Sequence, residues 1–107
     1  MHELRIYTSM PGRMPDLLRR FETAVMPIWA RHGIAQAGFW TDAADPASLD
    51  LRYLIRWESM AEREIKWNAF LQDPQWQAAF AASESQGKLV ARASSIFLQP
   101  TVFSAVQ

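Results

Sequence analysis

The sequence contains no cysteine. Disulfide bonds, thiolate nucleophiles and cysteine metal sites are therefore excluded. No stretch approaches the roughly 18 consecutive apolar residues of a membrane-spanning helix, so we expect no membrane span. The opening residues show no basic region followed by an apolar block. We therefore expect no signal peptide and a soluble protein with a cytoplasmic location.

Excess charge is also missing, because 11 basic residues balance 11 acidic ones. Without a positive surplus there is no electrostatic footprint for nucleic acid, so we expect no nucleic-acid partner. The glycine-rich phosphate loops and the nucleophile motif GxSxG are absent. The only histidines are His2 and His32, which are far apart in sequence. Together with the scattered acidic residues they match no ligand spacing, so we expect neither a metal nor another cofactor.

What is present is a hydrophobic content of 50% and five tryptophans in 107 residues. A chain of this length forms one domain, which we expect to span 1–107. So apolar a composition in so small a domain predicts that one face is buried against a partner.

The hydrophobic period changes several times along the chain. Alternation with period two predicts strands at 2–9, 34–41, 51–58 and 89–98. Apolar spacings of three and four predict a helix over 13–33 and a second helical segment over 59–87. The order β-α-β-β-α-β predicts an α+β, ferredoxin-like fold, a four-stranded antiparallel sheet with two helices on one face.

Several residues mark where these helices begin, bend and end. Ser59 and Glu62 form a capping-box pattern, and Asp73-Pro74 is typical of a helix that restarts after a break. Pro27 lacks an N–H and should kink the last turns of the first helix, which Gly33 should end.

The first strand has two faces, with Leu4, Ile6 and Thr8 on one and Glu3, Arg5 and Tyr7 on the other. Candidates for the sheet face away from the helices are Arg5, Tyr7, Leu54, Arg56, Ile96 and Leu98. That face is too mixed for a core and too apolar for solvent alone. We therefore predict a homodimer that pairs through this face.

An ordered set of short segments runs through nearly the whole chain: ELRIYT, RHGI, GFWT, YLIRWES, EREIKWNAF, DPQW and LQPTVFS. Together they resemble the NIPSNAP family. The resemblance implies a dimeric α/β barrel, in which the sheets of two ferredoxin-like subunits face each other, but no defined activity. The wider superfamily includes cofactor-independent monooxygenases, isomerases and haem-degrading enzymes, whose ligands lie between sheet and helices. No histidine here is placed as an axial ligand, which argues against haem.

Aromatic residues offer the first candidate site: Tyr7, Trp29, Trp40, Tyr53, Trp57, Trp67 and Trp76. They either fill the core or line a flat pocket for a small apolar or aromatic ligand.

The second candidate feature is a set of three arginines: Arg5, Arg56 and Arg63. They either pair with neighbouring glutamates or hold a carboxylate or enolate of a ligand, with Tyr7 as hydrogen-bond donor. We interpret His32 as a helix-end residue without a spaced carboxylate partner.

Two functions follow from these alternatives. One is a homodimeric protein that binds a small apolar ligand or a protein partner. The other is a cofactor-independent monooxygenase or isomerase of an aromatic or polyketide-like molecule. The ligand-binding candidates are Arg5, Tyr7, Trp40, Trp57, Arg63 and Trp67.

Overall fold

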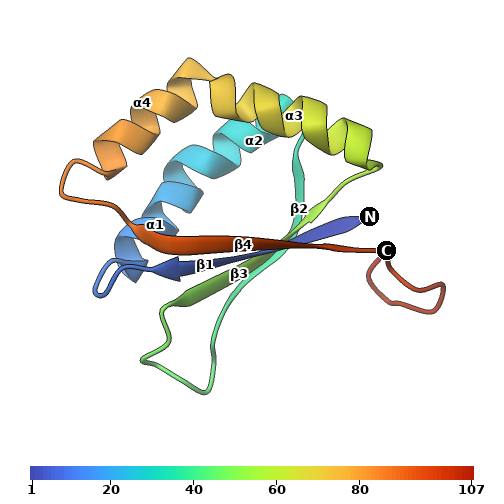
Figure 1. Ribbon diagram of the computed structural model, residues 1–107, viewed down its shortest axis with the longest axis horizontal. Coiled ribbons are helices and arrows are strands. Elements are labelled where there is room, and N and C mark those ends of the chain that lie inside the picture. Colours follow the sequence, from blue (N-terminus) through green and yellow to red (C-terminus); the bar gives the residue numbers. More distant parts are fainter.

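The computed structural model describes residues 1–107 and contains one antiparallel sheet with all helices on one side of it (Figure 1). The strands are β1 (His2–Ser9), β2 (Ala35–Thr41), β3 (Asp50–Arg56) and β4 (Val90–Leu98). Their spatial order is β2-β3-β1-β4, and every neighbouring pair is antiparallel. The predicted ferredoxin-like fold is confirmed.

The helical layer is made of two rods. The first contains α1 (Met14–Arg20), the π-helical turn η1 (Phe21–Val25) and α2 (Met26–His32). The second contains α3 (Met60–Gln72) and α4 (Pro74–Ser83), which meet at a bend (Figure 1). No helix is long and apolar enough to cross a membrane.

Most predicted helix ends are present, but α4 ends at Ser83, four residues before the predicted limit at 87, and residues 84–86 form turns. One capping bond of α3 also differs from the prediction. The Ser59 hydroxyl accepts from the Glu62 amide at 3.1 Å. The Glu62 carboxylate does not return a bond to Ser59 but accepts from the amide of Glu58 at 3.1 Å. Asp73 caps α4 by accepting from the amide of Gln75 at 2.8 Å. Gly33 ends α2 with a φ of 69°, the left-handed conformation that glycine adopts without steric cost.

Pro27 disturbs the first rod one turn earlier than predicted. The amide of Met26 bonds to the carbonyl of Phe21, five residues back, and the rod continues without ending. A proline ring collides with the carbonyl four residues before it, and it supplies no N–H. A wider π-turn accommodates the ring, and such turns are frequent at functional sites.

The assignment of Arg5 and Tyr7 to the outer sheet face is wrong. In the register, Arg5 lies between Tyr53 and Ser95, and Tyr53 is fully buried beneath the helices. The face of β1 that carries Glu3, Arg5 and Tyr7 therefore points toward the helices. The face that carries Leu4 and Ile6 points outward. The prediction failed because charged residues were expected to face solvent. Here groups from other segments, such as Arg63 and Ser95, bond to the inward-facing Glu3.

Thirteen buried hydrophobic residues form the core between sheet and helices. Its largest fully buried side chains are Trp29, Trp57 and Tyr53. Phe21 and Tyr53 pack edge-on with ring centroids 5.2 Å apart, and Phe39 stacks on Tyr53 at 4.7 Å. Edge-on and stacked pairs both suit the quadrupoles of the rings.

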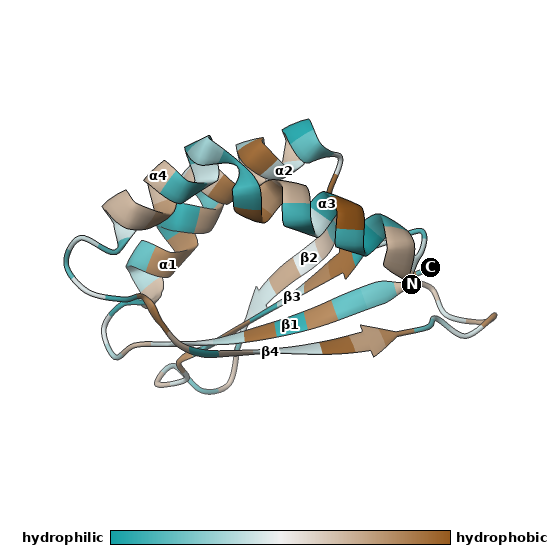
Figure 2. Ribbon diagram, turned by 45° about the horizontal axis from the view of Figure 1, so that its top comes forward, coloured by the Kyte–Doolittle hydropathy of each residue, from teal (hydrophilic) through white to brown (hydrophobic).

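No element covers the outer sheet face (Figure 2). Leu54, Leu4 and Ile96 lie side by side across three strands of that face. Ile96 and Leu98 are 49% and 41% exposed. Beyond β4, the chain turns back in a short loop that exposes Val102 and Phe103 almost completely (Figure 1).

Candidate functional site

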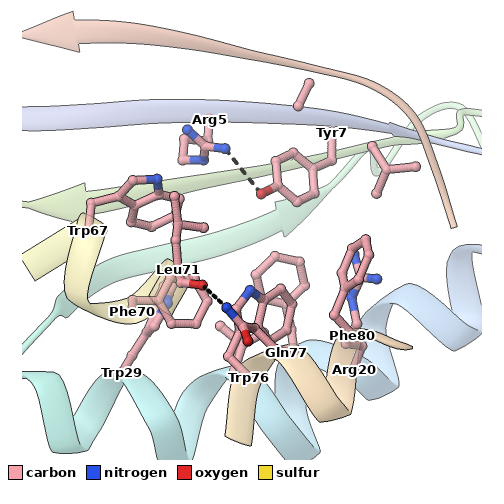
Figure 3. A pocket seen from close by; sticks show the side chains of 14 residues that line it. Arg5, Tyr7, Arg20, Trp29, Trp67, Phe70, Leu71, Trp76, Gln77 and Phe80 are labelled. Atoms are coloured by element: carbon pink, nitrogen blue, oxygen red, sulfur yellow. Dashed lines mark hydrogen bonds between the residues drawn. The ribbon is translucent and has the colours of Figure 1, made fainter. Parts of the chain in front are cut away.

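A cavity of about 570 Å³ lies between the sheet and the helices, at the end covered by α4 (Figure 3). Eleven of its fourteen lining residues are hydrophobic: Tyr7, Phe21, Val25, Trp29, Trp67, Phe70, Leu71, Trp76, Phe80, Val90 and Ala93. The three polar ones are Arg5, Arg20 and Gln77. A concave, mostly apolar space with a few polar groups is the usual form of a small-molecule site.

Small side chains and a loosely packed helix leave this space open. α4 contributes Trp76 and Phe80 to the wall, yet none of its residues is buried. On the sheet side, Ala93 lies opposite Tyr7 and presents only a methyl group. The π-turn η1 supplies Phe21 and Val25 to the same wall.

Arg5 is the central polar group of the cavity (Figure 3). Its Nε donates to the hydroxyl of Tyr53 at 2.8 Å and its Nη2 to the hydroxyl of Tyr7 at 3.1 Å. The guanidinium also lies 4.7 Å from the ring centre of Trp67, a cation–π distance. Burial alone would lower the pKa of Arg5, but the two phenol oxygens that accept its hydrogen bonds raise it, so this side chain stays charged.

Glu3 lies beside Arg5 on β1 and is completely buried. Its carboxylate accepts from Ser95 Oγ at 2.6 Å, Arg5 Nη1 at 3.1 Å, Trp57 Nε1 at 3.1 Å, and Arg63 Nε and Nη2 at 3.2 and 3.3 Å. Burial by itself would raise the pKa of Glu3, but the hydrogen bonds that it accepts, from Arg63 first, hold that pKa below the ordinary 4.5. Glu3 is thus an ionised counterion that holds Arg5 in place.

Arg20 lies at the opposite end of the cavity and is only 7% exposed. Its guanidinium packs against the rings of Trp76 and Phe80, at 5.5 and 5.2 Å from their centres. Its Nη1 donates to Ser83 Oγ at 3.2 Å and lies 3.6 Å from the carboxylate of Glu84. Burial lowers the pKa of Arg20, and Glu84 opposes that shift.

Two buried aromatic residues stand out, Tyr53 just outside the cavity lining and Trp29 in its wall. The Tyr53 hydroxyl, beneath Arg5, has a pKa raised above the ordinary 10.0, chiefly by burial and then by Tyr7. Tyr53 is therefore a neutral phenol. The indole N–H of Trp29 is buried and has no hydrogen-bond acceptor, which is rare for a core donor.

His32 does have a carboxylate partner, contrary to the sequence interpretation. Its Nε2 lies 2.7 Å from Oδ2 of Asp73, which also accepts from Arg31 at 2.8 Å. The bond to His32 is the main reason that the pKa of Asp73 falls from 3.8 to about 2. This cluster ties the end of α2 to the bend between α3 and α4, outside the cavity.

The sequence profile of the NIPSNAP family matches residues 2–105. The chain belongs to the NIPSNAP family. No curated protein sequence matches it.

Solved structures of other NIPSNAP proteins share the fold. A NIPSNAP family protein of Agrobacterium tumefaciens superposes with a TM-score of 0.86 at 21% identity, covering 99% of this chain and 97% of that one. An uncharacterised NIPSNAP domain protein of Burkholderia xenovorans gives 0.81 at 21% identity, covering 96% of each. A proposed antibiotic biosynthesis monooxygenase of Chloroflexus aurantiacus gives only 0.52 at 16% identity, covering 99% and 97%. These likenesses show the fold, and none assigns a role to this NIPSNAP chain.

The predicted ligand-binding residues fall into three groups. Arg5, Tyr7 and Trp67 line the cavity. Trp57 and Arg63 lie outside its lining and bond to Glu3. Trp40 is 51% exposed and pairs with Arg52 on the outer sheet face, so the structure does not bring it to the cavity. Arg56 is likewise outside, near Glu58 at 3.8 Å.

Sequence reasoning missed Arg20 and Phe80, which pack against each other at one end of the cavity. Arg20 lies three residues after Leu17 and one before Phe21, both of which are buried. A position next to the apolar stripe of the helix indicates burial. The positive charge of Arg20 instead suggested an exposed side chain, so the residue was overlooked.

Proposed function

We propose that this NIPSNAP chain binds a small apolar molecule in the cavity between its sheet and helices. The observation that carries the proposal is the 570 Å³ space with eleven hydrophobic residues among fourteen. Its volume lies within the range of about 300 to 1,000 Å³ that is usual for ligand pockets. Only Arg5, Arg20 and Gln77 are polar among its lining residues, so the apolar body of a ligand would contact mainly aromatic rings.

The test uses N-phenyl-1-naphthylamine, a neutral dye that fluoresces strongly only in apolar surroundings. We expect saturable binding at one site per chain. Ala93→Phe places a ring inside the cavity and should abolish binding. Ser94→Phe adds the same ring to the adjacent residue, on the outer face beside Ile6, and should leave binding intact. Equal binding by both variants would place the dye elsewhere and refute the proposal.

A second candidate function is cofactor-independent oxygenation or isomerisation of an aromatic substrate. It is favoured by the Tyr7 hydroxyl, which lies 3.1 Å from the Arg5 guanidinium at an apolar cavity. Such a pair can stabilise a substrate carbanion, which would itself reduce oxygen. Oxygen uptake with a panel of hydroquinones tests it. Uptake that Tyr7→Phe leaves unchanged, or no uptake at all, would argue against it.

The outer sheet face supports a further part of the proposal, pairing of two copies of the chain. The row of Leu54, Leu4 and Ile96 is uncovered, and a self-complementary sheet face suits a two-fold dimer. Sedimentation at micromolar concentration should give the mass of two chains. Ile96→Glu should yield monomers, whereas Ile65→Glu, at a 72% exposed site on α3, should not. A wild-type monomer would refute the dimer without affecting the cavity.

A further inference from the structure

The hydrogen bonds of Arg5 leave one donor free at the cavity. A guanidinium carries five N–H groups in a fixed fork. One goes from Nε to Tyr53, and two go from Nη1 to Glu3 and Ser95. One of the two N–H groups of Nη2 donates to the hydroxyl of Tyr7. The fifth N–H, also on Nη2, has no acceptor within the chain.

The Tyr7 hydroxyl supplies a second free donor beside it. Its oxygen accepts from Arg5 and from the buried Tyr53 hydroxyl, whose pKa this bond raises, so the Tyr7 hydrogen itself has no acceptor in the chain. Both groups line the cavity, and Figure 3 shows the Arg5 and Tyr7 side chains meeting at its sheet side. The structure therefore presents an N–H and an O–H donor from atoms only 3.1 Å apart.

Charge favours a negative acceptor for these two donors. Glu3 neutralises only one of its two arginine partners, Arg5 and Arg63. The other acid bonded to Arg63 is Glu64, whose side chain is 55% exposed and therefore screened by solvent. The cavity lining contains two arginines and no acidic residue. An anion at Nη2 gains attraction from Arg5, while the like charge of Glu3 lies outside the lining and is bonded to Nη1 of the same guanidinium.

We propose that the ligand is an apolar, ring-containing carboxylic acid whose carboxylate binds the free Nη2–H of Arg5 and the O–H of Tyr7. Two adjacent donors match the two oxygens of a carboxylate, whereas a phosphate dianion would keep further oxygens unpaired in an apolar space. The ring body lies along Trp67, Phe70 and Trp76. This inference rests on the proposed function, because it assigns the ligand class of the same cavity.

The experiment measures binding of 2-naphthoate and its neutral isostere 2-naphthamide by titration calorimetry at pH 7. We expect the acid to bind at least about tenfold more tightly than the amide. Tyr7→Phe removes one hydroxyl and keeps the ring, so it should remove most of that preference while the affinity for the amide changes less than about twofold. Arg5→Met should remove the preference completely. Arg56→Met, which deletes an exposed arginine outside the cavity, is the matched control and should behave as wild type.

Each other outcome overturns a defined part of the proposal. Equal affinities for acid and amide, or binding of the neutral dye but of neither naphthalene, would overturn the carboxylate and leave the cavity as a neutral-ligand site. A preference that persists in Tyr7→Phe and Arg5→Met but disappears in Arg20→Met would place the carboxylate at the opposite end. Failure of the dye and both naphthalenes to bind would refute the proposed function itself.

Discussion

The space between sheet and helices has two halves that differ in packing. One half is filled by Tyr53, Ile55 and Trp57, each at most 1% exposed and none of them in the cavity lining. Under α4 the space stays open, although Trp76 and Phe80 face it. Large side chains pack against one another in the closed half, whereas in the open half aromatic rings face Ala93 and two arginines. Aromatic content therefore does not distinguish a core from a cavity; the size and charge of the opposing residues do.

The largest expected contrast comes from truncating one tryptophan in each half. Trp57→Ala removes a buried ring and a hydrogen bond to Glu3, and should cost about 3–5 kcal/mol of unfolding free energy. Trp76→Ala removes a partly exposed ring that borders empty space, and should cost only about 1–2 kcal/mol. Urea unfolding measures both. Equal losses would mean that the two halves are equally packed in solution.

Glu3→Gln tests the ion pairs that Glu3 forms with Arg5 and Arg63. We expect a loss of about 2–3 kcal/mol at pH 7, because Arg5 and Arg63 keep their burial but lose their counterion, while an amide oxygen still accepts one bond. The folded-state pKa of Glu3 lies below the ordinary 4.5, so its stabilisation is complete above pH 4.5 and is lost as the pH falls through the folded pKa. Unfolding curves of wild type and variant should therefore converge in acid. A constant difference down to the lowest pH would contradict an ionised Glu3.

A smaller effect is expected from Asp73→Asn, at the hinge between the halves. The variant keeps a cap for α4 but weakens the bonds to His32 and Arg31. The pKa of Asp73 is about 2 in the fold against 3.8 ordinarily, so its contribution is present above about pH 4 and is lost between there and pH 2. Melting temperatures across that range should show a deficit for Asp73→Asn that disappears toward pH 2. A deficit that grows in acid would contradict the assignment.

Trp40→Ala should have the smallest effect on the cavity. Trp40 lies half exposed on the outer sheet face, so we expect dye and naphthoate affinities within about twofold of wild type and a stability loss of about 1 kcal/mol. Parallel titrations of Trp67→Ala, which alters the cavity wall, supply the contrast. Loss of ligand binding in Trp40→Ala would show that ligand also contacts the outer face.

Much of the fold followed from local patterns. Alternation predicted β1 with its observed bounds, and the remaining strands to within two residues at either end. The register between β2 and β3 shifts between Gln36 and Gly38, and a glycine inside a strand pattern is typical of such a bulge. These features depend on neighbours in sequence, which is why the sequence reveals them.

The site was less accessible to sequence reasoning. Arg5, Tyr7 and Trp67 were among the predicted residues, but on chemistry alone and with the wrong sheet face for the first two. Arg20 was missed because it meets Phe80 only through the packing of α4 on the first rod. The partner of His32 lies 41 residues away, beyond any helical spacing.

By itself, the sequence determined the element order, the helix starts and the NIPSNAP membership of this chain, because each depends on residue types in a local order. Only the tertiary structure decided which face of β1 is buried. A charged face can point inward when distant groups neutralise it, and here Arg63, Trp57 and Ser95 converge on Glu3 from three separate segments. These bonds to Glu3 allow the face of β1 with Arg5 and Tyr7 to point into the cavity. A local sequence pattern cannot reveal them, because the partners are distant in sequence.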